Sequence, residues 1–218
     1  MRLYDWYGAQ RVDQFISNSK NVAGRIKKFY RKESVVIYPP VETNVAASKK
    51  REDFYLIVSR IVGEKGIPMA MEAANKLGIK LKIVGEKAGL QWENSNIEKN
   101  ISENIEFLGR LDDESRNELY ATCKAFIVLE KDVDFGMTPV EAMACGAPVI
   151  AFANGGYLET VVDGKTGVFF DEYNVESLIK AIEKIDKLNI NAVNCKKQAE
   201  KFSKEKFVSS IKEIVYGS

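Results

Sequence analysis

The sequence contains no histidine, and its three cysteines stand far apart, without a CxxC pair. The lack of histidine excludes a Ser-His-Asp triad and the usual zinc ligand sets. Any catalysis must therefore use carboxylates, lysine, arginine, backbone dipoles or a residue from another chain. The cysteines predict buried thiols in a reducing compartment rather than a disulfide framework. They are Cys123, Cys145 and Cys195.

Long apolar runs and a strong charge of one sign are also lacking. No segment approaches the ~18 to 20 apolar residues of a membrane-spanning helix. The first ten residues are polar and aromatic, unlike a signal peptide, so we expect a cytoplasmic protein. The net charge of +1 creates no global field that would attract nucleic acid or an acidic membrane. The 218 residues suffice for one α/β domain plus a fragment of another.

What the sequence has instead is an alternation of short apolar runs with helical segments. Six runs are predicted to be strands: 54–59, 81–84, 105–108, 125–129, 148–152 and 167–170. Helices are predicted at 68–77, about 112–122, 138–145, 175–187, 192–202 and 204–216. This alternation predicts an α/β fold with a Rossmann-like, doubly wound parallel sheet. Ligands of such sheets bind beyond the carboxyl ends of the strands.

The clearest break in composition is the double proline at 39–40, which continues neither strand nor helix and so predicts a hinge. Before it, residues 12–29 are expected to be helical in pieces, with an interruption at 17–19. Residues 35–38 form a short β-branched run. The hinge therefore separates a small amino-terminal part from the α/β domain.

The loop after the first strand of that domain carries two cations, Arg60 and Lys65, and two glycines, Gly63 and Gly66. Glycine allows close approach to the backbone. The amino end of the following helix adds positive potential. The loop predicts a phosphate site, and the alternative is two ordinary surface cations.

A second glycine turn lies at 134–138 (Asp-Phe-Gly-Met-Thr) and leads into a helix that Thr138 is expected to cap. Backbone amides at that helix start can bind hydroxyls or phosphate oxygens. One turn further, Glu141 can hold a sugar diol through two hydrogen bonds. The alternative for Glu141 is a first-turn acid that favours the helix dipole, and the sequence leaves both open.

Other glycines also follow strands. Gly85 ends the second strand of the domain, Gly109 and Arg110 follow the third, and a Gly-Gly pair at 155–156 follows the fifth. A glycine at such a place can let a flat base lie on the backbone. An ordinary tight turn is the alternative.

Taken together, these motifs resemble the retaining glycosyltransferases of the GT-B fold, in the large family four that includes mannosyltransferases and glycogen synthase-like enzymes. The segments that carry the resemblance are NSKNVAGRIKKFY, VVIYPPVE, SRIVGEKGIPMAMEAA, IEFLGRL, DFGMTPVEAMACGAPVIAF and GGYLETVVDGKTGVFF. They cover nearly the whole chain in the family's order, and the run 134–152 is the most specific. The chain is most similar to mannosyltransferases of polysaccharide and O-antigen assembly.

The family has two Rossmann-like domains with the active site between them. The resemblance implies that residues 1–40 are a helical remnant of the acceptor domain and the hinge. Residues 41–203 would form the donor domain, which binds a nucleotide sugar such as a GDP- or UDP-sugar. Residues 204–218 would be a helix that returns towards the acceptor domain. No metal or other cofactor is implied. A separate acceptor-domain chain and a lipid-linked acceptor at a membrane are the implied partners.

The resemblance also implies residue roles. Arg60 and Lys65 would be the catalytic residues, because they bind the donor diphosphate and stabilise the leaving nucleotide. Glu141 would hold the ribose hydroxyls, and Gly109 and Arg110 would lie beside the base. Backbone amides at 135–137 would meet the sugar hydroxyls, with Thr138 near the phosphates. The remaining donor-binding positions are Gly85, Asp134, Phe135, Gly136 and Met137.

One departure from the family pattern concerns the donor sugar. The family usually has a glutamate eight positions before Glu141, where this chain has Val133. Valine cannot replace that contact, and Asp132 or Asp134 would substitute only if the loop shifted. We therefore expect the chain to bind a nucleotide but to transfer sugar slowly.

Two rival functions stay open. The first is a non-catalytic nucleotide-sugar-binding module, or one half of a split glycosyltransferase. The second is a sugar-nucleotide epimerase of the related GT-B fold, which the run DFGMTPVEAMACG disfavours. In every case we expect apolar surface to be exposed in the first 29 residues, at Leu3, Trp6, Tyr7, Val12, Phe15 and Ile16.

Overall fold

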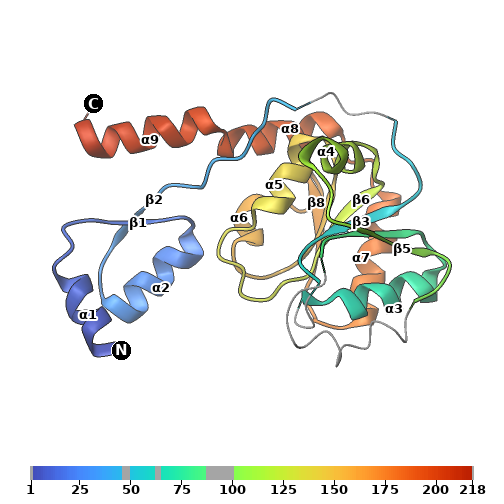
Figure 1. The fold of residues 1–218 in the computed structure, drawn as a ribbon, viewed down its shortest axis with the longest axis horizontal. Helices are drawn as coiled ribbons and strands as arrows, with labels where there is room; N and C mark the ends of the chain where they lie inside the picture. Colours follow the sequence, from blue (N-terminus) through green and yellow to red (C-terminus); the bar gives the residue numbers. More distant parts are fainter. Residues whose placement is uncertain (1, 46–49, 62–64, 87–100, 218) are drawn as a thin grey trace.

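The computed structural model describes residues 2–45, 50–61, 65–86 and 101–217 (Figure 1). Its centre is a six-stranded sheet in the order β5-β4-β3-β6-β7-β8, in which every pair of neighbours is parallel. The strands are β3 (Tyr55–Val58), β4 (Leu81–Val84), β5 (Ile105–Gly109), β6 (Ala125–Val128), β7 (Val149–Phe152) and β8 (Gly167–Phe170). The predicted Rossmann-like α/β fold is confirmed.

The strand order reverses direction once. From β3 the chain builds outward to β4 and β5, then returns to the other side of β3 with β6 and continues to β7 and β8. The carboxyl ends of β3 and β6 therefore lie side by side at the reversal, where open α/β sheets bind ligands. Every residue of β6 and β7 is buried, as expected for strands covered on both faces.

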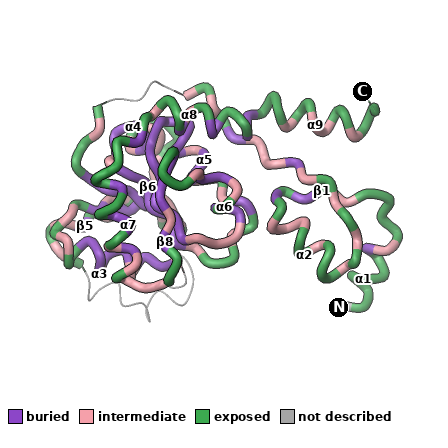
Figure 2. Tube along the Cα trace, turned by 180° about the vertical axis from the view of Figure 1, so that it is seen from behind, coloured by how far each residue is buried: buried purple, intermediate pink, exposed green. Residues whose placement is uncertain are grey.

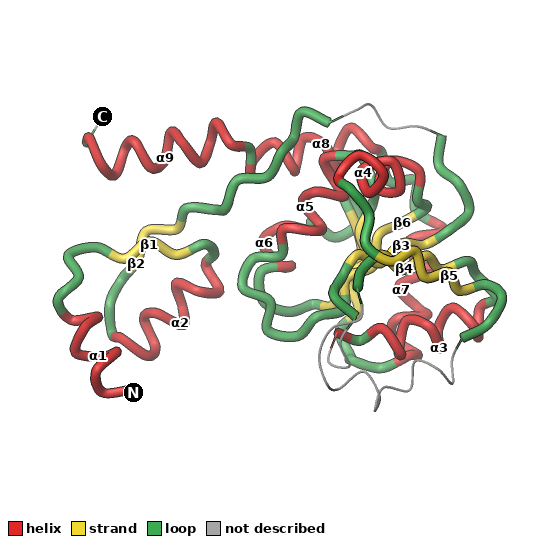
Figure 3. Tube along the Cα trace, viewed as in Figure 1, coloured by secondary structure: helices red, strands yellow, loops and turns green. Residues whose placement is uncertain are grey.

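Helices cover both faces of this sheet (Figure 3). The helices are α3 (Ile67–Leu77), α4 (Asp113–Thr122), α5 (Met137–Ala144), α6 (Tyr157–Thr160), α7 (Val175–Lys187), α8 (Ala192–Ala199), the 3-10 helix η4 (Glu200–Phe202) and α9 (Lys204–Tyr216). The three cysteines are buried as free thiols, and burial raises the pKa of each. No helix in the described ranges is long and apolar enough to cross a membrane.

The amino-terminal unit, residues 2–36, contains α1 (Arg2–Gln10), β1 (Phe15–Ser17), α2 (Lys20–Tyr30) and β2 (Ser34–Val36). The prediction of broken helix over 12–29 is wrong at 12–16, because residues 12–14 are not helical and β1 pairs in parallel with β2. The chain stays extended as far as Ser19, whose side chain caps α2 by accepting a hydrogen bond from the amide of Val22. The unit is thus a pair of helices with a two-stranded sheet rather than helices alone.

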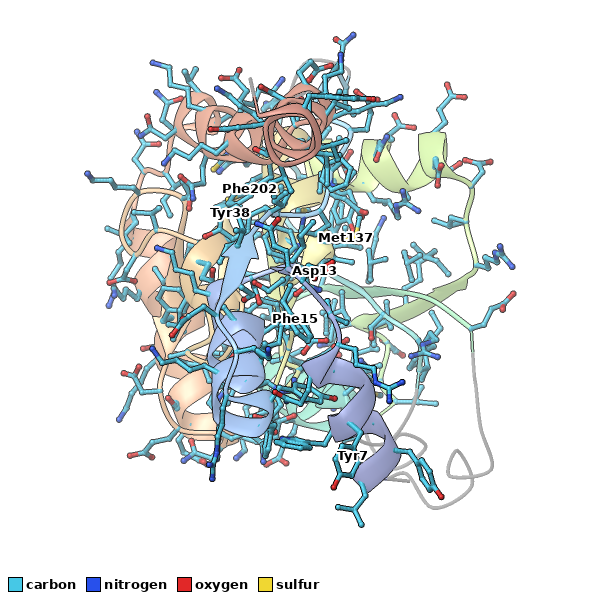
Figure 4. The ribbon with its side chains drawn as sticks, turned by 90° about the vertical axis from the view of Figure 1, so that its left-hand side faces the viewer. Tyr7, Asp13, Phe15, Tyr38, Met137 and Phe202 are labelled. Atoms are coloured by element: carbon cyan, nitrogen blue, oxygen red, sulfur yellow. The ribbon has the colours of Figure 1, made fainter. Side chains whose placement is uncertain are left out.

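The amino-terminal unit is mostly exposed (Figure 2). Tyr7 projects from the outer end of α1, with 62% of its surface accessible (Figure 4). The predicted exposure is confirmed for five of the six named side chains, which are Leu3, Trp6, Tyr7, Val12 and Ile16. Phe15 differs because its ring stacks on Tyr30, with the ring centres 6.0 Å apart, and is partly covered.

The segment that follows β2, which we call the linker, packs on the sheet domain through the ring of Tyr38. The rings of Tyr38, Phe135 and Phe202 form a triangle with centre-to-centre distances of 5.1 to 5.5 Å. Figure 4 shows Tyr38 and Phe202 next to each other. The amide of Val41 donates a hydrogen bond to the Phe202 carbonyl. Beyond this point α9 projects on the side of the amino-terminal unit (Figure 1).

Candidate functional site

Two helices begin with glycine at the reversal of the sheet. The N-cap residues of α3 and α5 are Gly66 and Gly136, with φ of 73° and 84°, and no side chain caps either helix. Side chains cap α4 and α7 instead, from Asp112 and Asn174. The first amides of a helix have no acceptor within the helix. At α3 and α5 these amides, with their positive potential, are left for a ligand.

The predicted cap of α5 was therefore wrong. Thr138 is the second residue of the helix, and Gly136 occupies the N-cap position. The reason lies in packing as well as in φ. A Cβ atom at Gly136 would lie 2.7 Å from the Tyr157 ring, and one at Gly66 would lie 2.6 Å from the Tyr173 hydroxyl. Both positions exclude a side chain, so neither helix can have a capping side chain at its N-cap position.

A cavity of about 580 Å³ opens beside the amino end of α3 and the segment that follows β6. Lys65 lines it, and its ammonium group lies 2.6 Å from the Glu130 carboxylate. The ammonium of Lys131 lies over the Tyr173 ring, 3.9 Å from the ring centre. The cavity is lined by Lys65, Gly66, Pro68, Met69, Glu130, Lys131, Asp132 and Tyr173. Two restrained cations and the amino end of α3 suit a polyanion such as a diphosphate.

Arg60, the other predicted cation, follows β3 at the same edge of the sheet, and its side chain is exposed. The predicted neighbours Gly63 and the other residues of 62–64 lie outside the described ranges. The structure thus brings Lys65 directly to the cavity. Arg60 stays on the surface, at the carboxyl end of β3.

Glu141 lies on α5 and faces α4. One of its carboxylate oxygens is 3.5 Å from the hydroxyl of Tyr120. Burial raises the pKa of Glu141, and the charge of Arg116 opposes that shift. Because α5 begins at Met137, Glu141 lies beyond the first turn, where the helix dipole has little effect. The alternative of a first-turn acid therefore loses its basis, and a ribose contact stays a prediction.

The glycines after β4 and β5 differ from each other. A Cβ atom at Gly85 would lie 1.9 Å from the Ser59 carbonyl oxygen, so strand packing alone requires glycine there. Gly109 has a φ of 66°, and a Cβ atom added there would have no neighbouring atom within 4 Å. It and Arg110 are exposed at the end of β5. Of these two glycines, Gly109 has the open space that a flat base would need.

The three residues before Phe135 point to different places. Asp132 has a left-handed φ of 54° and lines the cavity beside Lys65. Val133 packs against the core. The Asp134 carboxylate turns away to an ion pair with Arg25 of α2, 2.6 Å long. Of these two aspartates, Asp132 lines the Lys65 cavity and Asp134 does not.

The segment between Asp134 and α5 differs from a simple exposed turn. Phe135 is 2% exposed and buries its ring in the aromatic triangle, so only its backbone can face a ligand. Met137 is 43% exposed. The structure therefore leaves the backbone of 135–137 as the available group, in line with the predicted amide contacts.

Sequence reasoning assigned no site role to five residues of the cavity: Pro68, Met69, Glu130, Lys131 and Tyr173. Glu130 and Lys131 lie just beyond β6, the strand at which the order reverses, and that position was the available signal. Tyr173 comes from the loop after β8, and no pattern in the sequence marks it.

These features define a class of protein. An open parallel sheet with lysines and uncapped helix amino ends at its reversal is the arrangement of nucleotide-binding α/β domains. Residues 40–202 match the model of the family described as glycosyl transferases group 1, and the chain belongs to this family.

Known proteins resemble the chain over most of its length. An uncharacterized glycosyltransferase of Methanocaldococcus jannaschii is 29% identical over 98% of this chain and 62% of its own. The alpha-1,3/1,6-mannosyltransferase ALG2 of Dictyostelium discoideum is 29% identical over 81% of this chain and 49% of its own. The chain therefore spans less than two thirds of these relatives.

Among solved structures, the Anabaena protein HepE in complex with UDP-glucose matches with a TM-score of 0.81 and 22% identity. The match covers 96% of this chain and 65% of HepE. It supports the GT-B type of fold that the motifs predicted.

Proposed function

We propose that this chain forms the donor half of a retaining glycosyltransferase that takes a GDP- or UDP-sugar. The transferred group would be a mannosyl or glucosyl residue, used in polysaccharide or glycolipid assembly. The observation that carries the proposal is the uncapped amino end of α3 together with Lys65 and Lys131 on one cavity. The mannosyltransferase relative and the UDP-glucose bound to HepE support a nucleotide-sugar donor.

In this proposal the diphosphate enters the cavity at the reversal of the sheet. The amides that start α3 and α5 would bind its oxygens, and Lys65 and Arg60 would neutralise charge as the nucleotide leaves. Glu130 holds the Lys65 ammonium 2.6 Å from its carboxylate. Lys65 is thus oriented before the ligand arrives, and in this proposal no metal ion takes part.

The rest of the nucleotide sugar would extend along the ends of the strands. The base would lie on Gly109 and Arg110, where space is open, and the ribose would meet Glu141. Backbone amides of 135–137 would bind the sugar hydroxyls, with Thr138 near the phosphates. Asp132 lines the Lys65 cavity next to Val133 in the sequence, but it would make the contact that valine cannot make only if the loop shifted.

Transfer also needs an acceptor held against the sugar carbon, and such positioning supplies much of the rate of a bimolecular reaction. We propose that the acceptor groups come from the rest of a longer protein or from a partner chain. A lipid-linked acceptor would bring the complex to a membrane surface. The three buried free thiols fit a reducing compartment such as the cytoplasm.

A second function is favoured by one observation, the valine at 133. A nucleotide-sugar-binding module, or one half of a split glycosyltransferase, requires no carboxylate at that place. The two functions differ in what the purified chain does with a radiolabelled donor and a lipid-linked acceptor.

The test is that assay, run with the chain alone and after addition of a separate acceptor-domain protein. Slow or no transfer by the chain alone, with transfer restored by the added protein, supports a donor half. Binding without transfer in either case supports the binding module. Fast transfer by the chain alone would contradict the proposed need for added acceptor groups.

A further inference from the structure

The amino end of α2 is held by a carboxylate from a distant part of the chain. One oxygen of Glu159, in α6, accepts a hydrogen bond from the amide of Lys20 at 2.8 Å. The other oxygen accepts from the amide of Asn21 at 2.9 Å. A negative charge at a helix amino end is favourable, and bonds to an ionised acceptor are stronger than neutral ones. The first two amides of α2 are thus satisfied by the donor domain.

The linker contributes a third bond to the same carboxylate. The hydroxyl of Tyr38 donates to Glu159 over 3.0 Å. Burial, and secondly this bond, raise the pKa of Tyr38 to about 12, so the hydroxyl keeps its proton at neutral pH. Glu159 therefore joins three parts of the chain: the donor domain, the linker and the amino-terminal unit.

From α2, two side chains reach the segment 132–136, which we call the donor loop. The side-chain amide of Asn21 donates to the carbonyl of Val133 over 3.1 Å. Arg25 pairs with the Asp134 carboxylate at 2.6 Å. The position of α2 thus restrains the donor loop at two successive residues.

The other side of the donor loop rests on the turn at 154–156. The amide of Gly156 donates to the same Val133 carbonyl over 2.9 Å, and the side chain of Asn154 accepts from the amide of Asp132 at 3.0 Å. A Cβ atom at Gly155 would lie 2.3 Å from the Val133 carbonyl oxygen, so the contact has no room for a side chain. The loop is clamped between this turn and α2.

The donor loop, which is held between α2 and the turn at 154–156, ends at Gly136, the N-cap residue of α5. Its position therefore determines where the uncapped start of α5 lies. We propose that Glu159 and Asn21 are positioning residues, which hold α2 against the donor loop and so orient the amides that begin α5. Neither residue touches the cavity beside Lys65. Their effect on a nucleotide sugar rests on the proposed function, whereas their effect on the loop does not.

The test is hydrogen exchange of backbone amides, followed peptide by peptide, in Glu159→Gln and Asn21→Ala. Glu159→Gln keeps the shape but removes the charge, and Asn21→Ala removes only the bond to the loop. Glu159→Gln should raise exchange across 132–137 by about tenfold or more, the factor that loss of a charge-assisted bond allows, and Asn21→Ala, which loses a neutral bond, should raise it by about threefold or more. Exchange in β7, behind the loop, should stay unchanged.

Glu176→Gln is the matched control. Glu176 makes a surface ion pair with Lys76 at 3.3 Å, far from the donor loop in the chain, and should leave exchange at 132–137 unchanged. The proposal is overturned if Glu159→Gln raises exchange in α2 alone, or uniformly over the molecule. A uniform rise would indicate a loss of global stability rather than positioning.

Calorimetry with UDP and UDP-glucose separates this inference from the proposed function. If the wild type binds either, the two variants should weaken binding of the sugar nucleotide by at least about threefold, while the control should not. If the wild type binds neither at millimolar concentration, these donors are wrong for the proposed function. The exchange data then still decide the role of Glu159 and Asn21.

Discussion

The donor domain and the amino-terminal unit use their apolar side chains in opposite ways. Every residue of β6 and β7 is buried. Between residues 3 and 36, by contrast, Ala9 is the one hydrophobic residue that the structure buries. A parallel sheet is normally covered on both faces, and two strands alone are barely stable. The amino-terminal unit is therefore held by its contacts with the donor domain, among them those of Glu159.

This contrast implies that nucleotide binding and sugar transfer depend on different parts of the chain. The residues around the Lys65 cavity all come from the donor domain, which has its own core, so a nucleotide site can form there without help. The amino-terminal unit contacts the donor loop, next to the site, through Asn21 and Arg25 of α2. Nucleotide binding should thus survive changes in the unit that impair anything built on it.

The largest expected effect comes from a matched pair of phenylalanines. Phe126 in β6 is fully buried against Tyr120, and Phe126→Ala should cost about 3 to 5 kcal/mol of unfolding free energy. Phe29 in α2 is 60% exposed, and Phe29→Ala should change it by less than about 0.5 kcal/mol. Urea unfolding followed by circular dichroism measures both. Similar losses in the two variants would remove the contrast between the two regions.

The next effect concerns the phosphate cations. Replacing Arg60 and Lys65 together by alanine should weaken nucleoside diphosphate binding by at least about 2 kcal/mol, given about 1.5 to 3 kcal/mol for each bond to a charged group. Lys76→Ala, at the far end of α3, is the control and should bind as the wild type does. Unchanged affinity of the double variant by calorimetry would reject the phosphate assignment.

Glu141 should give a smaller effect, and one that depends on pH. Burial raises the pKa of this carboxyl above its unfolded value, so folding favours the protonated acid. The cost of burying the carboxylate is absent below the unfolded pKa and complete above the raised one. Glu141→Gln should therefore unfold at nearly the same temperature at pH 7, or slightly higher.

The same substitution should weaken nucleotide binding, because a ribose diol prefers the carboxylate as acceptor. In the wild type, affinity should fall as the pH drops through the raised pKa, and in Glu141→Gln this dependence should disappear. Calorimetry at several pH values measures it. Intact binding together with a large loss of stability would instead give Glu141 a structural role between α4 and α5.

The smallest expected effect is at the exposed face of α1. Tyr7→Ser, at a side chain that is 62% exposed, should leave stability and nucleotide affinity unchanged. It should reduce concentration-dependent self-association, because large apolar patches on a surface promote association. Sedimentation velocity over a range of concentrations measures this. A wild type that is monomeric at all concentrations would show that this face does not cause self-association in solution.

Much of the fold could be predicted because its strands are short, continuous apolar runs. The strands at 81–84 and 167–170 have the predicted bounds, and the others differ by a residue or two. β1 escaped prediction because three residues give no periodicity, and its pairing partner β2 lies 17 residues beyond it. The helix α1 was missed as well, since its exposed aromatic residues form no apolar stripe.

Site residues that follow the end of a strand could be predicted from the sequence. Those whose position depends on packing between distant segments could not. Lys65 was found because it follows a buried strand. Its partner Glu130 depends on β6 lying next to β3, which only the strand order reveals. The cap at Gly136 depends on the Tyr157 ring, 21 residues later. Asp134 was assigned to the donor, but its direction is set by Arg25, which lies far away in the sequence.

The most direct test of a self-sufficient donor site is calorimetric titration of the purified chain with GDP, UDP, GDP-mannose and UDP-glucose. The account predicts saturable binding of one nucleoside diphosphate at a single site. The matching sugar nucleotide should bind less than about tenfold more tightly, since Val133 offers the sugar no carboxylate and tenfold corresponds to about 1.4 kcal/mol. No binding of any of the four at millimolar concentration, by a chain shown to be folded, would contradict the account.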